Sequence, residues 1–171
     1  AEEIAAGLAQ EGVGEGDTVI VSHETSPDTF AAFLGAMMVG AVPAMMPYPN
    51  AKQRDELYWR SHRELYGKIN PRLFLLSPKL LALHRENLAD LSQQFVSVAD
   101  FKALASAPLA YRTRPEATAF LQHSSGTTSL KKGVMLGHRT VVDHVRRYAD
   151  VIGLTHESEI ASWLPLYHDM G

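Results

Sequence analysis

The sequence predicts an α/β fold in which helices flank a mainly parallel β-sheet, and two observations carry this prediction. Short apolar segments that read as strands alternate with segments whose apolar residues recur at helical spacing. Twice, at 26–27 and 77–78, a Ser-Pro pair follows an apolar strand-like segment. Serine favours the N-cap and proline the first helical position. Such strand–helix alternation is typical of parallel sheets covered by helices.

The first half of the chain contains two strand–helix units. Residues 1–13 read as a helix and 17–23 as a short buried strand. A helix starts after Ser26, and one of its faces carries Phe30, Phe33, Leu34, Met37 and Met38. Residues 51–70 predict a charged amphipathic helix. The strand at 72–78 then leads into a helix with Leu81, His84, Leu88 and Leu91 at helical spacing.

The second half continues the alternation. We expect strands at 94–98, 117–125 and 159–165, and a loop at 106–116. Residues 138–154 predict a helix whose apolar side carries Val141, Val145, Tyr148, Ala149 and Ile152.

Composition excludes several classes of protein. The 171 residues are 46% hydrophobic and 20% charged, as in soluble globular domains, and contain no cysteine. A disulfide framework is therefore excluded, and we expect a reducing, cytoplasmic location. The net charge of −3 gives no drive toward nucleic acid or an anionic membrane. Prolines 43, 47 and 49 interrupt the uncharged run at 29–51, so we expect no integral membrane segment.

The charge is unevenly distributed along the chain. Residues 1–51 hold seven acidic side chains and no Lys or Arg, so all sixteen basic residues lie in 52–171. Two interpretations stay open: a solvated acidic first segment, or an anion site in the basic part.

The stretch "HSSGTTSLKKG" at 123–133 has the composition of an anion-binding loop. Glycine lets the backbone approach an anion, Ser and Thr hydroxyls donate hydrogen bonds, and lysine adds charge. Its spacing is not that of a P-loop, which needs Gly, four residues, then Gly-Lys-Ser/Thr. By residue type alone, a phosphate site and a solvated surface loop stay equal alternatives.

Two motifs in order resemble the adenylate-forming superfamily of acyl-CoA synthetases, adenylation domains and luciferases. The first is "SSGTTSLKKGV" with the histidine of "HRTVV" after it, and the second is "SWLPLYHDMG" about thirty residues on. Ser129 and Lys131 stand where the family usually has Gly and Pro. "WLPLYHDMG" looks most like fatty acyl-AMP ligases and long-chain acyl-CoA synthetases.

The resemblance implies a two-step reaction and a set of site residues. A fatty acid would attack the α-phosphate of Mg-ATP, and CoA or the phosphopantetheine thiol of an acyl carrier protein would then take the acyl group. The residues implied to hold the β- and γ-phosphates are Ser124, Ser125, Gly126, Thr127, Thr128, Lys132 and Gly133. Thr128 would also contact Mg²⁺. Lys132 would act in catalysis, and His168 would line the acyl pocket near the reacting carboxylate.

Other conspicuous side chains receive structural interpretations. We expect Trp163 in the core, with a pocket wall as the alternative, and His84 as a core or edge histidine with its hydrogen bonds satisfied. The remaining histidines show no spacing that would bind a metal, and no Gly-x-Ser-x-Gly elbow of a serine hydrolase is present.

The resemblance also implies that the chain is part of a larger protein. We expect residues 1–171 to be a partial N-terminal AMP-binding domain, truncated at both ends, because family members carry further nucleotide-binding residues and a catalytic lysine downstream. The fragment alone would then be inactive. An isolated phosphate- or nucleotide-binding module and a structural α/β domain without catalysis remain the alternatives.

Overall fold

The computed structural model describes residues 1–50, 54–101, 114–123 and 133–168. These residues form a six-stranded sheet in the order β4-β3-β1-β2-β5-β6. The strands are β1 (Thr18–Ser22), β2 (Val42–Met45), β3 (Leu73–Leu76), β4 (Gln94–Ser97), β5 (Thr118–His123) and β6 (Gly133–Gly137). The first five pair in parallel, and β6 pairs antiparallel with β5. The predicted α/β class with a mainly parallel sheet is therefore confirmed.

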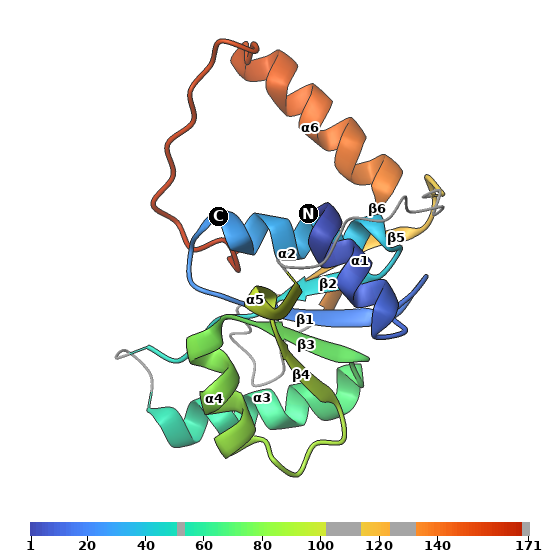
Figure 1. Cartoon of the computed structure of the whole chain (residues 1–171). Helices are drawn as coiled ribbons and strands as arrows, with labels where there is room; N and C mark the ends of the chain where they lie inside the picture. The colour runs from blue at the N-terminus through green and yellow to red at the C-terminus, as the bar shows by residue number, and fades with distance from the viewer. Residues whose placement is uncertain (51–53, 102–113, 124–132, 169–171) are drawn as a thin grey trace.

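Helices cover both faces of this sheet (Figure 1). The helices are α1 (Glu2–Gln10), α2 (Pro27–Met38), α3 (Asp55–Ile69), α4 (Pro78–Asn87), α5 (Val98–Phe101) and α6 (His138–Ile152). Helices α1, α2 and α5 lie on one face, and α3 and α4 lie on the other. Helix α6 extends away from the sheet after β6. None of these helices has the length and apolar character needed to cross a membrane.

The two Ser-Pro pairs start helices as predicted. Pro27 and Pro78 are the first residues of α2 and α4. The Ser77 hydroxyl accepts a hydrogen bond from the Leu80 amide at 3.3 Å, which satisfies one of the free amides of the first turn. At the start of α2, the Ser26 amide donates to the Thr29 hydroxyl at 3.3 Å.

Alternation along the central strand β1 divides the core into two layers. Val19 and Val21 pack on the side of α1 and α2, while Ile20 packs against α3 and α4. Because successive strand residues point to opposite faces, a strand buried on both sides becomes a continuous apolar run. This is why "VIV" reads as a buried strand without polar alternation.

The predicted apolar face of α2 is not its buried face. Phe30 and Leu34 are about half exposed, at 50% and 49%. The buried residues of α2 are instead Thr29 and the small residues Ala32, Gly35 and Ala36. Close approach of α1 requires small side chains at the contact, and spacing alone could not show which stripe faces the neighbour.

Three further predictions were incomplete or wrong. Strand β6 was not predicted, although "GVMLG" pairs along most of β5. Residues 159–165 do not form a strand, because among the described residues no neighbouring strand supplies hydrogen bonds. Trp163 is 90% exposed and does not belong to the core.

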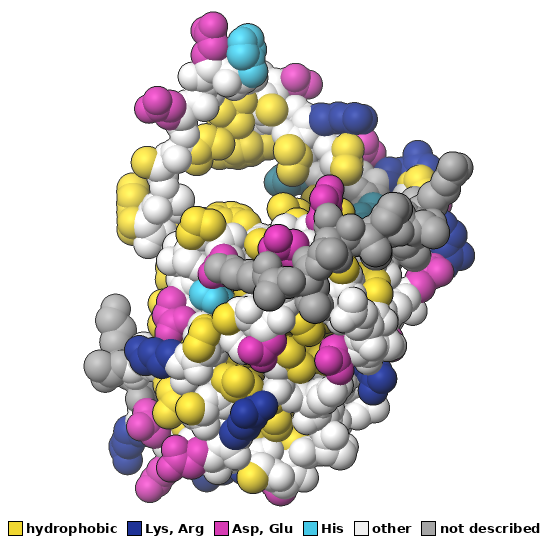
Figure 2. All heavy atoms as spheres, viewed as in Figure 1, with side chains coloured by type: hydrophobic (Ala, Val, Ile, Leu, Met, Phe, Trp, Pro, Cys, Tyr) yellow, Lys and Arg dark blue, Asp and Glu magenta, His cyan; other side chains and the backbone are white. Residues whose placement is uncertain are grey.

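Helix α6 buries none of its residues. Its exposed apolar side chains include Val142, Val145, Tyr148, Val151 and Ile152. Figure 2 shows hydrophobic side chains along the side of this helix that is turned toward the body of the molecule. The predicted periodicity was correct, but the apolar side has no covering element among the described residues.

Candidate functional site

The candidate site lies at the edge of the sheet where the parallel strands end. Ligands of parallel α/β sheets bind outside the carboxyl ends of the strands. Strand β5 ends at His123, which pairs with Gly133 at the start of β6. The predicted phosphate loop therefore leaves from and returns to this edge.

Most of the predicted phosphate-binding residues fall within 124–132, outside the described residues. These are Ser124, Ser125, Gly126, Thr127, Thr128 and Lys132. Of the predicted set, Gly133 and His168 are described. His138 opens α6, as the resemblance implied.

Gly133 lies in a narrow space beside the end of β5. A methyl group at its Cα would lie 3.3 Å from Nε2 of His123, closer than most carbon contacts. Glycine therefore lets the first residue of β6 pair tightly with His123 at the base of the loop.

His168 closes a turn at residues 165–168. Its amide donates to the Pro165 carbonyl at 2.9 Å. The preceding carbonyl, of Tyr167, accepts a hydrogen bond from Nε2 of Gln122 at 3.4 Å. Gln122 is the next-to-last residue of β5, so this contact brings the turn beside the base of the loop although the two are 45 residues apart.

The Tyr167 ring meets a second aromatic ring at the same edge. Tyr48, which follows β2, stands edge-to-face with Tyr167, with 5.8 Å between the ring centroids and 86° between the planes. Partial burial raises the pKa of the Tyr167 hydroxyl, and the neighbouring Tyr48 raises it further. The turn that carries His168 is thus attached to both β2 and β5.

A small cavity lies between this turn and the ends of β1 and β2. Its lining residues are Val21, His23, Thr25, Thr29, Met45, Met46, Leu166 and Tyr167. The hydroxyl of Thr29 donates to the Glu24 carbonyl at 2.7 Å and lies 3.4 Å from Nδ1 of His23. These hydrogen bonds fix the polar side of the cavity.

The neighbouring Glu24 side chain is held in its charged form. Burial opposes the charge, but hydrogen bonds from Ser77 and from the Glu24 backbone, with the nearby His23 and Lys79, leave the pKa of this carboxyl lowered. The lowered pKa favours the carboxylate form of Glu24, which lies 3.9 Å from Nζ of Lys79.

Sequence reasoning missed His23, Tyr48, Gln122 and Tyr167 as site residues. The signal that could have found them is position, because each lies at the end of a strand or beside a recognised motif. Their meeting depends on strand order, which the residue pattern does not contain.

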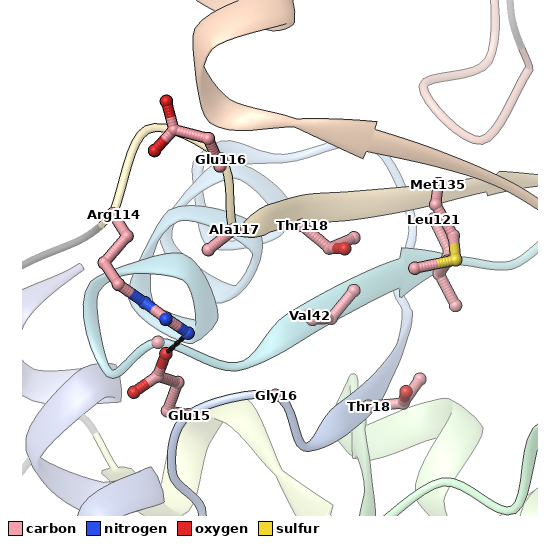
Figure 3. A pocket seen from close by; sticks show the side chains of 11 residues that line it. Glu15, Gly16, Thr18, Val42, Arg114, Glu116, Ala117, Thr118, Leu121 and Met135 are labelled. Carbon is pink, nitrogen blue, oxygen red and sulfur yellow. Dashed lines mark hydrogen bonds and ion pairs between the residues drawn. The ribbon is translucent and has the colours of Figure 1, made fainter.

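A second hollow lies at the opposite edge of the sheet, where β1, β2 and β5 begin (Figure 3). Val42, Leu121 and Met135 give it an apolar wall. At its rim, Nη2 of Arg114 lies 2.5 Å from Oε1 of Glu15. Neither Gly133 nor His168, the two predicted site residues that the structure describes, lines this hollow.

Within the described residues, no group of three or more His, Asp or Glu side chains is arranged to hold a metal ion. Thr128, the predicted Mg²⁺ ligand, lies outside the described residues.

The chain belongs to the AMP-binding enzyme family, whose pattern matches residues 1–171. It is 30% identical over 167 residues to a 4-hydroxyphenylalkanoate adenylyltransferase of Mycobacterium tuberculosis, covering 91% of this chain and 26% of that protein. It is 32% identical over 162 residues to a putative acyl-CoA synthetase of Caulobacter vibrioides, covering 94% and 28%.

The same family is found among solved structures. A fatty acyl-adenylate ligase from Legionella pneumophila, solved with acyl adenylate and pyrophosphate, superimposes with a TM-score of 0.83 at 26% identity. That superposition covers 99% of this chain and 29% of the ligase. The chain thus spans less than a third of the length of each of these relatives.

Proposed function

We propose that the chain forms part of an ATP-dependent ligase that activates a fatty acid as an acyl adenylate. The observation that carries this proposal is the contact between Gln122 and Tyr167, at 3.4 Å. It joins the base of the Ser/Thr/Lys-rich loop to the turn that carries His168. The described ends of the two motifs, Gly133 and the 165–168 turn, lie at one edge of the sheet, which supports a shared site.

In the first step, a carboxylate oxygen attacks the α-phosphorus of ATP, and the bond to the bridging oxygen of the β-phosphate breaks. Pyrophosphate leaves with increased negative charge. The hydroxyls of Ser124, Ser125, Thr127 and Thr128 would donate hydrogen bonds to it, and Gly126 and Gly133 would let the backbone approach. The Lys132 ammonium would add positive charge where negative charge develops.

Mg²⁺ bound to ATP would supply further charge neutralisation, and the Thr128 hydroxyl would be its protein ligand. His168 would line the place of the reacting carboxylate. In the second step, a thiol sulfur of CoA or of a carrier-protein phosphopantetheine attacks the acyl carbonyl, and AMP leaves.

We further propose that the 171-residue chain does not complete this reaction alone, and that residues 1–171 are part of an N-terminal AMP-binding domain. Support comes from the relatives, of which it spans 26% and 28%. A cytoplasmic location remains a prediction from the absence of cysteine.

The test measures pyrophosphate release by the complete gene product with ATP and a series of fatty acids. Thr128→Ala and Lys132→Ala should each lower the rate by about 10²-fold, the usual loss for one donor to a developing charge. Matched controls are Thr140→Ala and Lys68→Ala, at exposed helical positions, which should leave the rate unchanged. Equal rates in all four variants would show that the loop assignment is wrong.

The isolated chain separates the remaining alternatives. Acyl-adenylate formation by residues 1–171 alone would refute the proposed incompleteness. A rise in its melting temperature with millimolar ATP or pyrophosphate, without turnover, would identify a binding module. No shift and no activity in the complete gene product would favour a structural α/β domain.

A further inference from the structure

We propose that Tyr48 is a positioning residue, which holds the 165–168 turn and thereby places His168 at the carboxyl edge of the sheet. This inference rests on the proposed function, in which His168 lies near the reacting carboxylate. Tyr48 itself is not assigned any contact with substrate.

The segment after α6 reaches the body of the molecule at this turn. Before it, Ile160 and Trp163 are 78% and 90% exposed, and no residue of 153–163 is buried. Figure 1 shows the segment running from the far end of α6 back toward the sheet. Leu166 and Tyr167 are half-buried and form one wall of the small cavity. The position of His168 therefore depends on what holds these two residues.

The Tyr48 ring is the aromatic partner of Tyr167. Its edge-to-face geometry, with 5.8 Å between centroids, is the arrangement that aromatic pairs favour. Such a pair fixes direction as well as distance, because the edge of one ring must meet the face of the other. A rotation of the turn would break this contact.

Tyr48 is in turn held by the core. The hydroxyl of Tyr58, on α3, donates to the Pro47 carbonyl at 2.7 Å. Tyr58 is only 1% exposed, so the residue that fixes Pro47 is itself fixed. A connected path thus leads from α3 through Pro47 and Tyr48 to Tyr167 and His168.

Gln122 provides a second, weaker attachment. Its hydrogen bond to the Tyr167 carbonyl, at 3.4 Å, is long, and it leaves the ring of Tyr167 free to turn. Gln122 ties the turn to β5, whereas Tyr48 sets its orientation. Loss of Tyr48 should therefore affect His168 more than loss of Gln122.

The variants Tyr48→Ala and Tyr48→Phe, in the complete gene product, test this proposal. Phenylalanine keeps the ring edge, so it should behave like the wild type. The matched control is Tyr148→Ala, which removes a tyrosine of α6 that is 56% exposed. Gln122→Ala and Tyr48→Leu keep the test decisive if Tyr48→Ala does not fold.

The first measurement is amide hydrogen exchange at His168, whose amide closes the turn onto Pro165. Tyr48→Ala, or Tyr48→Leu in its place, should speed this exchange at least tenfold and leave the amides of β1 and β3 unchanged. Tyr48→Phe and Tyr148→Ala should change neither. Unchanged exchange in Tyr48→Ala would overturn the proposal, whether or not the protein has the proposed activity.

The second measurement is pyrophosphate release with ATP and fatty acid. Because misplacement by about 1 Å costs about 10²-fold in rate, Tyr48→Ala should lower kcat at least tenfold. KM for ATP should stay within about twofold, since the phosphate loop leaves from β5. Faster exchange with unchanged kcat would refute the positioning role. A wild type that releases no pyrophosphate would instead refute the proposed function. The exchange of the His168 amide would then still decide whether Tyr48 holds the 165–168 turn.

Discussion

The His84 imidazole meets the Trp59 indole edge-on, with 5.1 Å between the ring centroids, in a space that also contains Phe74 and Phe95. Its Nδ1 lies 2.9 Å from the Leu80 carbonyl. Its Nε2 is buried without a hydrogen-bond partner among the described residues, so the predicted core histidine is confirmed but is only half satisfied. Burial lowers the pKa of His84 to about 4.

This geometry predicts a loss of stability in mild acid. An unfolded histidine has a pKa near 6.5, so the unfolded chain binds a proton that the folded chain excludes between about pH 4 and 6.5. The contribution of neutral His84 to the free energy of unfolding is therefore complete above about pH 6.5. It falls as the pH drops toward 4, by about 3 kcal/mol at most. Urea denaturation between pH 4 and 7 measures it.

The variant His84→Phe isolates this effect because its ring cannot titrate. Its free energy of unfolding should change less with pH than that of the wild type. The control His156→Gln removes an exposed histidine and should keep the wild-type dependence of the free energy of unfolding on pH. An unchanged slope in His84→Phe would contradict the assignment.

A pair of glycines predicts opposite effects of the same substitution. A methyl group at Gly35, in α2, would lie 2.8 Å from Cβ of Ile4 and from the Ala1 carbonyl oxygen. Gly35→Ala should therefore destabilise the fold by about 1–3 kcal/mol. Gly67, in α3, has open space around it, and Gly67→Ala should stabilise by about 0.5–1 kcal/mol. A Gly35→Ala variant that melts at or above the temperature of the wild type would refute the close α1–α2 contact.

The N-cap of α4 predicts a moderate loss of stability when its serine is replaced. Ser77 is 3% exposed and its hydroxyl accepts the Leu80 amide. Ser77→Ala leaves that amide without its partner and should lower the free energy of unfolding by about 1 kcal/mol. Ser92→Ala, at an exposed loop serine, should cost less than about 0.5 kcal/mol. Equal urea midpoints for the two variants would argue against the cap.

The open apolar side of α6 predicts self-association of the isolated 171-residue chain. Val145 and Val151 are 59% and 84% exposed, beside other apolar side chains. The double variant Val145→Glu, Val151→Glu should shift the chain toward monomer in size-exclusion chromatography with light scattering. The control is the double variant Ala82→Glu, Ala89→Glu, which adds the same charge at exposed positions outside α6. It should leave the association unchanged. A wild-type chain that elutes as a monomer at all concentrations would contradict the prediction.

The candidate site was only partly predictable. The family was indicated by the resemblance of two motifs in order, "SSGTTSLKKGV" and "LPLYHDMG", because residue types alone fit a solvated surface loop equally well. The contacts of Tyr167 with Tyr48 and Gln122 were not predictable. They join segments that are far apart in sequence and depend on β2 and β5 being neighbours.

The sequence by itself determined the local structure: buried strands, Ser-Pro helix starts and the periodicity of α6. These features follow from interactions within a few residues, so they can be recognised in the chain. Tertiary structure alone decided which face of each element is covered. Phe30 is half exposed while Gly35 is buried, because a close helix neighbour requires small residues. Residues 159–165 remain unpaired within the described part, because a strand needs a partner that its own residues cannot provide.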